Sequence, residues 1–169
     1  KFAKNGSIAD VIRGIQENNS LPEDYSDTCR QIILIGISNG MKYLHERNYI
    51  HGNLKAENVL LDGQFNPLIT DFFGHLYRDT KLGNSIRYSA PEILTNSTYD
   101  KKIDLYAFGM LMYEILTNSF SYPELEYGDM SDLDFKYKVV KNKYRPKLDN
   151  KIKESLQEII TKCWSDDPN

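Results

Sequence analysis

The sequence predicts an α+β domain that is mainly α, with several helices and one small β ribbon. Apolar residues recur every three or four positions in several segments, which is the spacing of one face of an amphipathic helix. The spacing changes between residues 59 and 70, where two short apolar runs flank the turn residues Asp62 and Gly63. A length of 169 residues with 40% hydrophobic content is enough for one domain around one core.

Two helices are expected in the first part of the chain. The first covers residues 7–16, with Ser7 as its N-cap. The second covers residues 25–47, and either Ser26 or Asp27 can cap it. The residues expected to face the core are Ile8, Val11, Ile12 and Ile15 in the first helix, and Ile32, Ile33, Ile37, Met41 and Leu44 in the second.

The β ribbon and three more helices follow. Residues 59–61 and 68–70 are expected to pair as two short strands joined by a turn. Residues 71–92 are polar and contain glycines, so we expect a loop of 22 residues, and loops of that length are usually functional or mobile. Residues 102–117 are apolar around much of the helix circumference, which indicates a buried central helix. The remaining helices are expected at residues 131–141 and 151–164.

Composition excludes several classes of protein. The net charge of −3 gives no reason to expect nucleic acid as a partner. The longest apolar runs, residues 32–37 and 105–113, are too short to cross a bilayer, so no membrane segment is expected in this chain. The two cysteines, Cys29 and Cys163, lie far apart and fit a reducing compartment better than a disulfide framework. The expected location is the cytoplasm.

Several short motifs occur in order along the chain. Residues 51–58 read H-G-N-L-K-A-E-N, and D-F-F follows at Asp71, twenty residues after His51. The later motifs are A-P-E from Ala90, D-L-Y-A-F-G from Asp104, R-P from Arg145 and C-W-S-D-D-P from Cys163.

The order and spacing of these motifs resemble those of a protein-kinase domain. The octapeptide is similar to the catalytic loop H-R-D-L-x-x-x-N, and D-F-F is similar to the metal-binding D-F-G. R-P and C-W-S-D-D-P resemble signatures of tyrosine kinases and of the tyrosine-kinase-like group of serine/threonine kinases. The resemblance covers essentially all 169 residues. It implies one domain, residues 1–169, with a catalytic loop at 51–58, a metal loop and activation segment at 71–92, and a central helix at about 102–117.

The resemblance is to the helical C-lobe of the kinase fold. Lys4 to Ile8 resembles the N-G-S-L stretch just past the hinge between the two lobes. The N-lobe, with its glycine-rich loop and its lysine, is therefore expected to be absent from this chain, and ATP and Mg are implied as ligands only together with that lobe. Glu92 has no expected ion-pair partner, because the arginine that usually follows C-W-x-x-D-P is not part of the sequence.

Three residues of the resemblance carry chemistry. Asn58 and Asp71 match the two metal-holding positions, and both side chains offer the oxygen ligands that magnesium prefers. Lys55 matches the catalytic-loop lysine of serine/threonine kinases, which neutralises charge on the transferred phosphate. The alternatives are a solvated lysine at Lys55, a turn residue at Asp71 and a local cap of the loop at Asn58.

The other matched positions are supporting ones. His51 and Phe72 are expected to pack, and Asp104 is expected to accept backbone N–H bonds from the catalytic loop. Leu60 is the candidate for packing on the adenine side of a nucleotide. The candidate residues of the activation segment are Thr80, Ser85 and Glu92, of which Ser85 stands where serine/threonine kinases place a threonine that contacts the catalytic loop.

Three departures from the kinase pattern argue against turnover. Asn53 replaces the aspartate that accepts the proton of the attacking hydroxyl, and an amide cannot act as that base. Gly52 replaces the arginine that pairs with a phosphorylated activation segment in many kinases. Phe73 replaces a glycine of the metal loop, although the neighbouring Gly74 can supply part of the lost backbone freedom. Asn53 decides the interpretation.

Three hypotheses about function therefore stand. The preferred one is a pseudokinase of the tyrosine-kinase-like group that acts in signal transduction as a binding or allosteric module for a protein partner. The second is an active serine/threonine protein kinase, a transferase that moves the γ-phosphate of ATP to a protein substrate. The third is a fragment without an independent role.

Two blocks of charge lie in the C-terminal part of the chain. Residues 124–134 contain five acidic and no basic residues, and residues 136–153 contain eight basic residues against the single acid Asp149. Solvated faces of adjacent loops and helices are the favoured interpretation, and a polarised interaction surface is the alternative.

Overall fold

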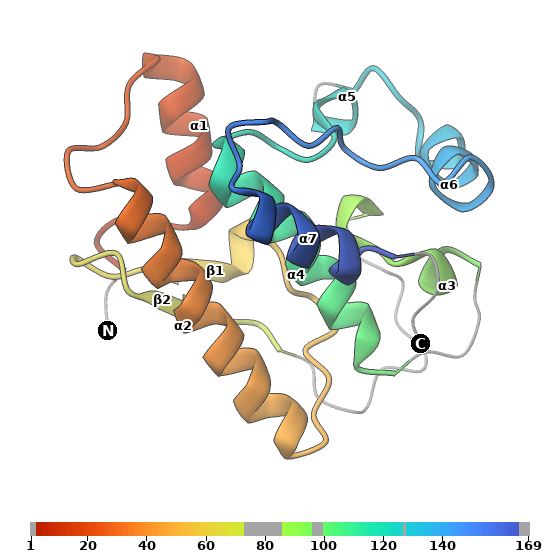
Figure 1. The fold of residues 1–169 in the computed structure, drawn as a ribbon, viewed down its shortest axis with the longest axis horizontal. Helices are drawn as coiled ribbons and strands as arrows, with labels where there is room; N and C mark the ends of the chain where they lie inside the picture. Colours follow the sequence, from red (N-terminus) through yellow and green to blue (C-terminus); the bar gives the residue numbers. More distant parts are fainter. Residues whose placement is uncertain (1–2, 73–85, 96–99, 127, 166–169) are drawn as a thin grey trace.

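The structure is a computed structural model, and it describes residues 3–72, 86–95, 100–126 and 128–165 (Figure 1). Thr80 and Ser85 of the expected activation segment and the departure at Phe73 lie outside these residues. The described part is mainly helical, and its single sheet has two strands, as the sequence predicts.

The first two helices frame one side of the molecule. Helix α1 spans Ile8–Asn18 and begins with a capping box, in which the side chains and backbone N–H groups of Ser7 and Asp10 bond reciprocally. Helix α2 spans Asp27–Glu46, and its N-cap is Ser26, so the expected start at residue 25 was two residues early. Both predicted helices are thus confirmed, with different ends.

The core face of α2 differs from the expected one at two positions. Ile32 was expected to face the core, but its side chain is 51% exposed. Leu34 takes a place in the core beside Ile33 and Ile37. The reason is angular: at about 100° per residue, the buried side chains of α2 fall within an arc of about 100°, and Ile32 projects roughly 150° from the centre of that arc.

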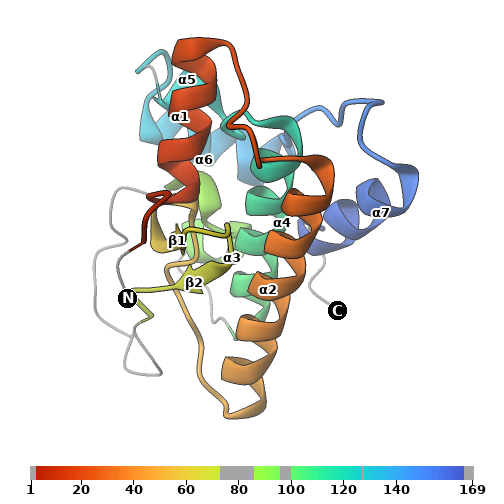
Figure 2. The same cartoon turned by 90° about the vertical axis from the view of Figure 1, so that its left-hand side faces the viewer.

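The β ribbon lies against α2. Strand β1 spans Val59–Leu61, and strand β2 spans Pro67–Ile69, one residue earlier than expected. The two strands are antiparallel, and Figure 2 shows the ribbon below α1 and beside α2. The approach is close, because a Cβ added to Gly36 of α2 would lie 2.4 Å from the Cγ of Pro67.

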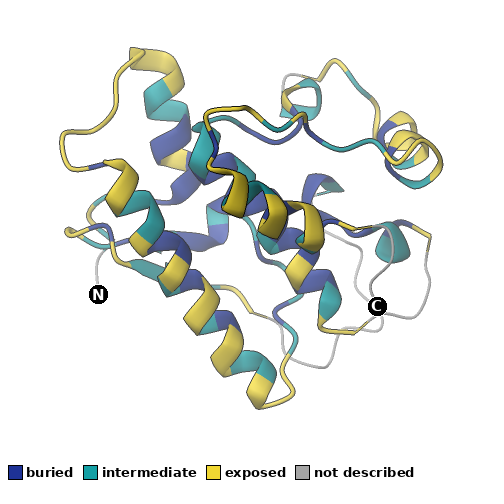
Figure 3. Cartoon of the chain, viewed as in Figure 1, coloured by how far each residue is buried: buried dark blue, intermediate teal, exposed yellow. Residues whose placement is uncertain are grey.

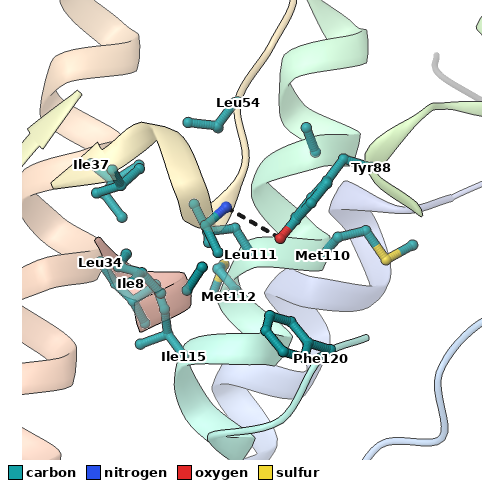
Figure 4. Close-up of a cluster of buried hydrophobic side chains, with 14 of the residues drawn as sticks. Ile8, Leu34, Ile37, Leu54, Tyr88, Met110, Leu111, Met112, Ile115 and Phe120 are labelled. Atoms are coloured by element: carbon teal, nitrogen blue, oxygen red, sulfur yellow. Dashed lines mark hydrogen bonds between the residues drawn. The ribbon is translucent and has the colours of Figure 1, made fainter. Parts of the chain in front are cut away.

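Helix α4, Lys102–Thr117, is the centre of the fold and has the predicted bounds. Its residues are buried on most sides, and Figure 3 shows its largely dark, buried ribbon behind the more exposed α7. Helix α7, Glu154–Cys163, packs along it and is shorter at both ends than expected. Figure 4 shows α4 side chains meeting residues of α1 and α2 in one apolar cluster that includes Ile8, Leu34 and Ile37.

The remaining elements have ten residues or fewer. Helix α6 spans Asp132–Lys141 with Ser131 as its N-cap, which confirms the predicted helix. The expected 22-residue loop is wrong at its C-terminal end, because backbone hydrogen bonds form two short helical segments there. The two segments in the expected loop are η3, Ile86–Tyr88, and α3, Pro91–Leu94. Two further unpredicted segments lie elsewhere in the chain: η1, Ala56–Asn58, and α5, Pro123–Glu126.

Candidate active site

The loop that precedes η1 is held in place by one buried carboxylate. Asp104, in the first turn of α4, accepts a hydrogen bond from the backbone N–H of His51 and another from that of Gly52, both at 2.8 Å. The same carboxylate lies 2.8 Å from the Nε2 atom of His45. These are the backbone contacts that the resemblance implies for Asp104. An ionised acceptor makes such bonds roughly twice as strong as neutral ones.

His51 is a structural residue of this loop. Its side chain is fully buried, and its Nδ1 atom accepts the backbone N–H of Asn53 at 3.2 Å. Burial lowers the pKa of His51, although the Asp104 carboxylate and the carbonyl of Thr70 act in the opposite direction. The imidazole that accepts the backbone N–H of Asn53 at its Nδ1 atom holds the loop in shape.

Gly52 adopts a left-handed backbone conformation with φ of +71°. No side-chain or backbone atom lies within 4 Å of a Cβ placed there, so the space is open and the constraint comes from the backbone. Residues with a Cβ rarely adopt this conformation. The backbone conformation of Gly52 therefore disfavours an arginine at this position.

Asn53 is fixed through its backbone. Its N–H donates to His51, and its carbonyl accepts a hydrogen bond from the Nδ2 atom of Asn58 at 2.8 Å. The side chain of Asn53 is half-buried and takes no part in either contact. An amide in this place can orient a hydroxyl group but cannot take its proton.

Asn58 and Asp71 reach the same end of the β ribbon. The strand register pairs Val59 with Ile69, and beyond this pair the Asn58 carbonyl accepts from both the N–H and the hydroxyl of Thr70, at 2.9 and 3.1 Å. Asp71 follows directly, is exposed, and has a left-handed φ of +57°. The two expected metal-holding residues thus flank the same end of the ribbon, because Asn58 directly precedes β1 and Asp71 follows β2 after Thr70.

The donor set fits a magnesium ion that also binds phosphate. Asn58 offers an amide oxygen and Asp71 a carboxylate, both hard ligands. The part of the chain that the structure describes contains no group of three or more His, Cys, Asp or Glu side chains that could hold a metal. Mg²⁺ commonly uses one or two carboxylates and completes its shell with water and phosphate oxygens. Asn58 also caps the loop, so the alternative role considered for it is present in the structure.

The other expected site residues lie nearby with different degrees of exposure. Lys55 is half-buried, and its carbonyl accepts the N–H of Asn58 at the start of η1. Leu60 is half-exposed on the face of β1 opposite the buried Val59 and Leu61. Phe72 contacts the ring of Tyr49 edge-on, with centroids 6.2 Å apart, but stays 52% exposed, so the packing expected of it is partial.

A cavity of about 360 Å³ lies between α2 and α4, away from this site. Its lining includes His45, Asp104, Leu105 and Phe108, and it contains none of the residues expected to bind metal or phosphate. The cavity thus lies next to Asp104, which supports the catalytic loop, and not at the candidate metal and phosphate positions.

Comparison with known proteins agrees with this geometry. The sequence profile of the family described as "Protein tyrosine and serine/threonine kinase" matches residues 1–169. The chain belongs to the protein kinase family. The helical part with its small ribbon is the C-lobe of that fold.

Relatives of this kinase domain cover nearly all of it. RGS domain-containing serine/threonine-protein kinase A of Dictyostelium discoideum is 31% identical over 100% of the chain and 14% of its own length. Serine/threonine-protein kinase STY17 of Arabidopsis thaliana is 30% identical over 99% of the chain and 28% of its own length. Dual specificity protein kinase pyk3 of Dictyostelium discoideum is 34% identical over 100% of the chain and 12% of its own length. The chain therefore spans less than a third of each of these relatives.

The kinase domain contains a buried polar network that the sequence analysis missed. The hydroxyl of Tyr88 accepts the N–H of Ala56, beside the catalytic loop, at 3.2 Å, and donates to the Oε2 atom of Glu114 at 2.5 Å. Glu114 is fully buried in α4 and also accepts from the N–H and hydroxyl of Ser121. Figure 4 shows the Tyr88 ring beside α4 with its hydroxyl directed at the loop backbone.

Burial sets the protonation behaviour of this network. It raises the pKa of the Tyr88 hydroxyl well above its usual value, with the Glu114 carboxylate acting in the same direction. Burial also raises the pKa of Glu114, against the effects of Arg87, Tyr88 and Ser121, which lower it. The Tyr88 hydroxyl is therefore protonated and able to donate at neutral pH.

Arg87 joins the end of the activation segment to three other elements. Its guanidinium lies 2.8 Å from Glu57 in η1, 2.5 Å from Glu126 in α5 and 3.9 Å from Glu114 in α4. Burial lowers the pKa of Arg87, but Tyr88 and the three carboxylates outweigh it, and the pKa is raised. The sequence gives one signal for this network, because Glu114 is the single acidic residue in the apolar stretch 105–116. That signal indicates a buried acid but does not identify its partners.

Glu92 lies in the first turn of α3, behind Pro91 at the start of the helix. Its side chain is half-buried, and within the described ranges it forms no ion pair. A carboxylate in the first turn of a helix interacts favourably with the helix dipole.

Over the residues that the structure describes, no helix combines the length and hydropathy that crossing a membrane requires.

Proposed function

We propose that this kinase domain is a pseudokinase of the tyrosine-kinase-like group that serves signal transduction by binding a protein partner. The observation that carries the proposal is Asn53 at the position of the catalytic base. Loss of a general base typically lowers a rate by about two to four orders of magnitude. Gly52 adds to the proposal, because its left-handed backbone disfavours the arginine that would pair with a phosphorylated activation segment.

Nucleotide binding is a separate part of the proposal and requires an N-lobe. Asn58 and Asp71 would hold Mg²⁺, Lys55 would meet the phosphates, and Leu60 would offer an apolar surface on the adenine side. The bound metal would supply neutralisation of phosphate charge. The residues of this chain would position the phosphates and restrict water, and Asn53 would accept no proton.

The test is a phosphate-transfer assay on the full-length protein with a generic protein substrate. We expect transfer at the level of an Asp71→Ala control, and an increase of about 10²-fold to 10⁴-fold in Asn53→Asp. Brisk metal-dependent transfer by the natural protein that disappears in Asp71→Ala would refute the proposal. A thermal-shift measurement with Mg²⁺ and ATP tests nucleotide binding independently of turnover.

The second candidate function is that of an active serine/threonine kinase. Lys55, Asn58 and Asp71 are all retained, and the relatives include proteins named serine/threonine and dual-specificity kinases. In that case water or the substrate phosphate would carry the proton. Metal-dependent transfer at equal rates by the natural protein and Asn53→Asp would favour this candidate.

Cytoplasmic action and a protein partner belong to the proposal. Cys29 and Cys163 are both free thiols, which suits a reducing compartment. Covalent labelling of both thiols in intact cells, measured by mass spectrometry, tests this assignment.

A further inference from the structure

The cavity of about 360 Å³ lies where the second half of α2 packs against the first half of α4. Its lining side chains on α2 lie between Ser38 and Glu46, and those on α4 lie between Lys101 and Phe108. Each set recurs every three or four positions, so it occupies one face of its helix. Pockets that bind small molecules have volumes of about 300–1,000 Å³. The cavity is therefore large enough for a small ligand.

Apolar side chains form one part of the cavity wall. Met41 of α2 is buried and Phe108 of α4 is half-buried. Leu105 is 44% exposed, which makes it the most exposed large hydrophobic side chain of the central helix. A ligand with an apolar ring would cover these side chains and remove Leu105 from water, which is favourable.

Ionisable side chains form most of the rest of the wall, and within the described part of the chain all but one of them are paired. His45 lies 2.8 Å from Asp104, and Asp104 also accepts two backbone N–H groups of the catalytic loop. Lys42 lies 3.8 Å from Glu46. Lys101 is exposed and forms no ion pair with any described residue. The unpaired charge at the cavity is therefore positive.

We propose that this cavity binds a small aromatic carboxylate. The ring of the ligand packs against Met41, Leu105 and Phe108, and its carboxylate meets the ammonium group of Lys101. Lys101 and Leu105 are four residues apart, so they are neighbours on the same face of the helix and one small molecule can contact both.

Size and charge favour this class of ligand over others. The lining residues of α2 fall within positions 38–46, which is about 12 Å of helix. A groove of this length does not supply the ~800 Å² per partner that a stable protein complex buries. A cationic ligand would meet the unpaired Lys101, whereas both acids of the wall, Glu46 and Asp104, already have partners.

Binding in this cavity acts on the catalytic loop. Asp104 belongs to the cavity wall and holds the backbone N–H groups of His51 and Gly52. A ligand that binds only the closed, folded wall opposes its local opening. The amides of the loop should therefore exchange with solvent more slowly when the ligand is bound.

The first experiment measures hydrogen exchange by mass spectrometry on the full-length protein without nucleotide, and its probe is naphthalene-2-carboxylate. For a ligand of this size we expect a dissociation constant of about 0.1–1 mM. At about 5 mM probe, exchange in residues 38–46, 101–108 and 51–52 should slow by about 6-fold to 50-fold, and exchange in α7 should not change. Naphthalene-2-methylammonium has the same rings with a positive charge and should slow exchange by less than about twofold.

The second experiment compares matched variants by the probe concentration that gives half of the full protection. Lys101→Glu should raise the dissociation constant at least about fivefold, and Leu105→Asp at least about tenfold. Lys162→Glu and Leu133→Asp make the same changes at exposed positions of α7 and α6 and should stay within about twofold of the natural protein. Circular dichroism checks that all variants are folded.

Protection that is confined to the cavity and the loop, and that is lost in the two cavity variants, would support the proposal. Absence of protection by the carboxylate, equal protection by the ammonium analogue, or an equal loss of affinity in the two control variants would each overturn it. Both experiments are done without ATP, so their outcomes do not depend on nucleotide binding or phosphate transfer.

Discussion

The carboxylate of Asp104 accepts the backbone N–H of Gly52 at 2.8 Å, which fixes the catalytic loop to the central helix. This bond joins residues 52 positions apart in the sequence. It lies next to the equivalent bond from His51, so one side chain orients two consecutive peptide groups. The conformation of the catalytic loop therefore depends on these two hydrogen bonds to α4.

Asp104→Ala should destabilise the chain by about 2–4 kcal/mol, because two N–H groups lose a buried charged acceptor. Urea denaturation followed by circular dichroism measures the change. Asp24→Asn is the matched control, since Asp24 is exposed, and it should stay within about 0.5 kcal/mol of the natural chain. A loss below about 1 kcal/mol in Asp104→Ala would contradict the supporting role of this carboxylate.

Tyr88→Phe should lower the free energy of unfolding by about 1–3 kcal/mol. The substitution keeps the ring but removes the hydroxyl that connects the Ala56 N–H to Glu114, so two buried polar groups lose a partner. Tyr43→Phe removes a hydroxyl from a side chain that is 56% exposed and should have no measurable effect. Equal unfolding midpoints for the two variants would show that the network adds no stability.

Asn58→Asp separates the two roles of Asn58. The carboxylate keeps an oxygen ligand for a metal but loses the N–H that binds the Asn53 carbonyl. We expect the chain to lose about 1–3 kcal/mol of stability, while Mg²⁺-dependent ATP binding by the full-length protein persists. Asn58→Leu should lose both the stability and the Mg²⁺-dependent ATP binding. Unchanged stability in Asn58→Asp would mean that the contact with Asn53 is unimportant.

Gly36→Ala and Gly14→Ala should change stability in opposite directions. The new methyl group at position 36 would lie 2.4 Å from the rigid ring of Pro67, and we expect a net loss of about 1–2 kcal/mol. A Cβ added to Gly14 would meet no neighbouring atom within 4 Å, so alanine there should stabilise the chain by up to about 1 kcal/mol through helix propensity. Thermal denaturation of the two variants side by side checks this.

Asp10 should make the stability of α1 depend on pH. Hydrogen bonds from the backbone and hydroxyl of Ser7 lower the pKa of Asp10 below its usual 3.8. A lowered carboxyl pKa adds stability that is fully present above the unfolded pKa and is lost as the pH falls through the folded pKa. Asp10→Asn should therefore be less stable than the natural chain at pH 7, and the difference should shrink as the pH falls below about 4. Urea unfolding midpoints of the two proteins at pH 7 and below about pH 4 measure this difference.

Local patterns predicted most of the helices, and long-range contacts explain what they missed. The ends of α4 and the cap of α6 follow from nearby residues, so their prediction succeeded. Ile32 was misplaced because spacing alone does not fix where the buried stripe of a helix is centred. η3 and α3 could not be foreseen because η3 depends on contacts with α4 and α3 on contacts with α6.

The same distinction applies to the site. Motif spacing predicted that Asp104 supports the loop, since that role follows from matching the chain to a known pattern. The Arg87 cluster joins residues 30 and 39 positions apart, and nothing near Arg87 in the sequence names Glu57 or Glu126 as its partners. Whether the matched metal and phosphate positions bind their ligands stays a prediction.

His51 and Asn58 both contact the main chain of Asn53. Neither contact depends on whether an acid or an amide stands at this position. The shape of the loop is therefore no guide to whether the domain transfers phosphate.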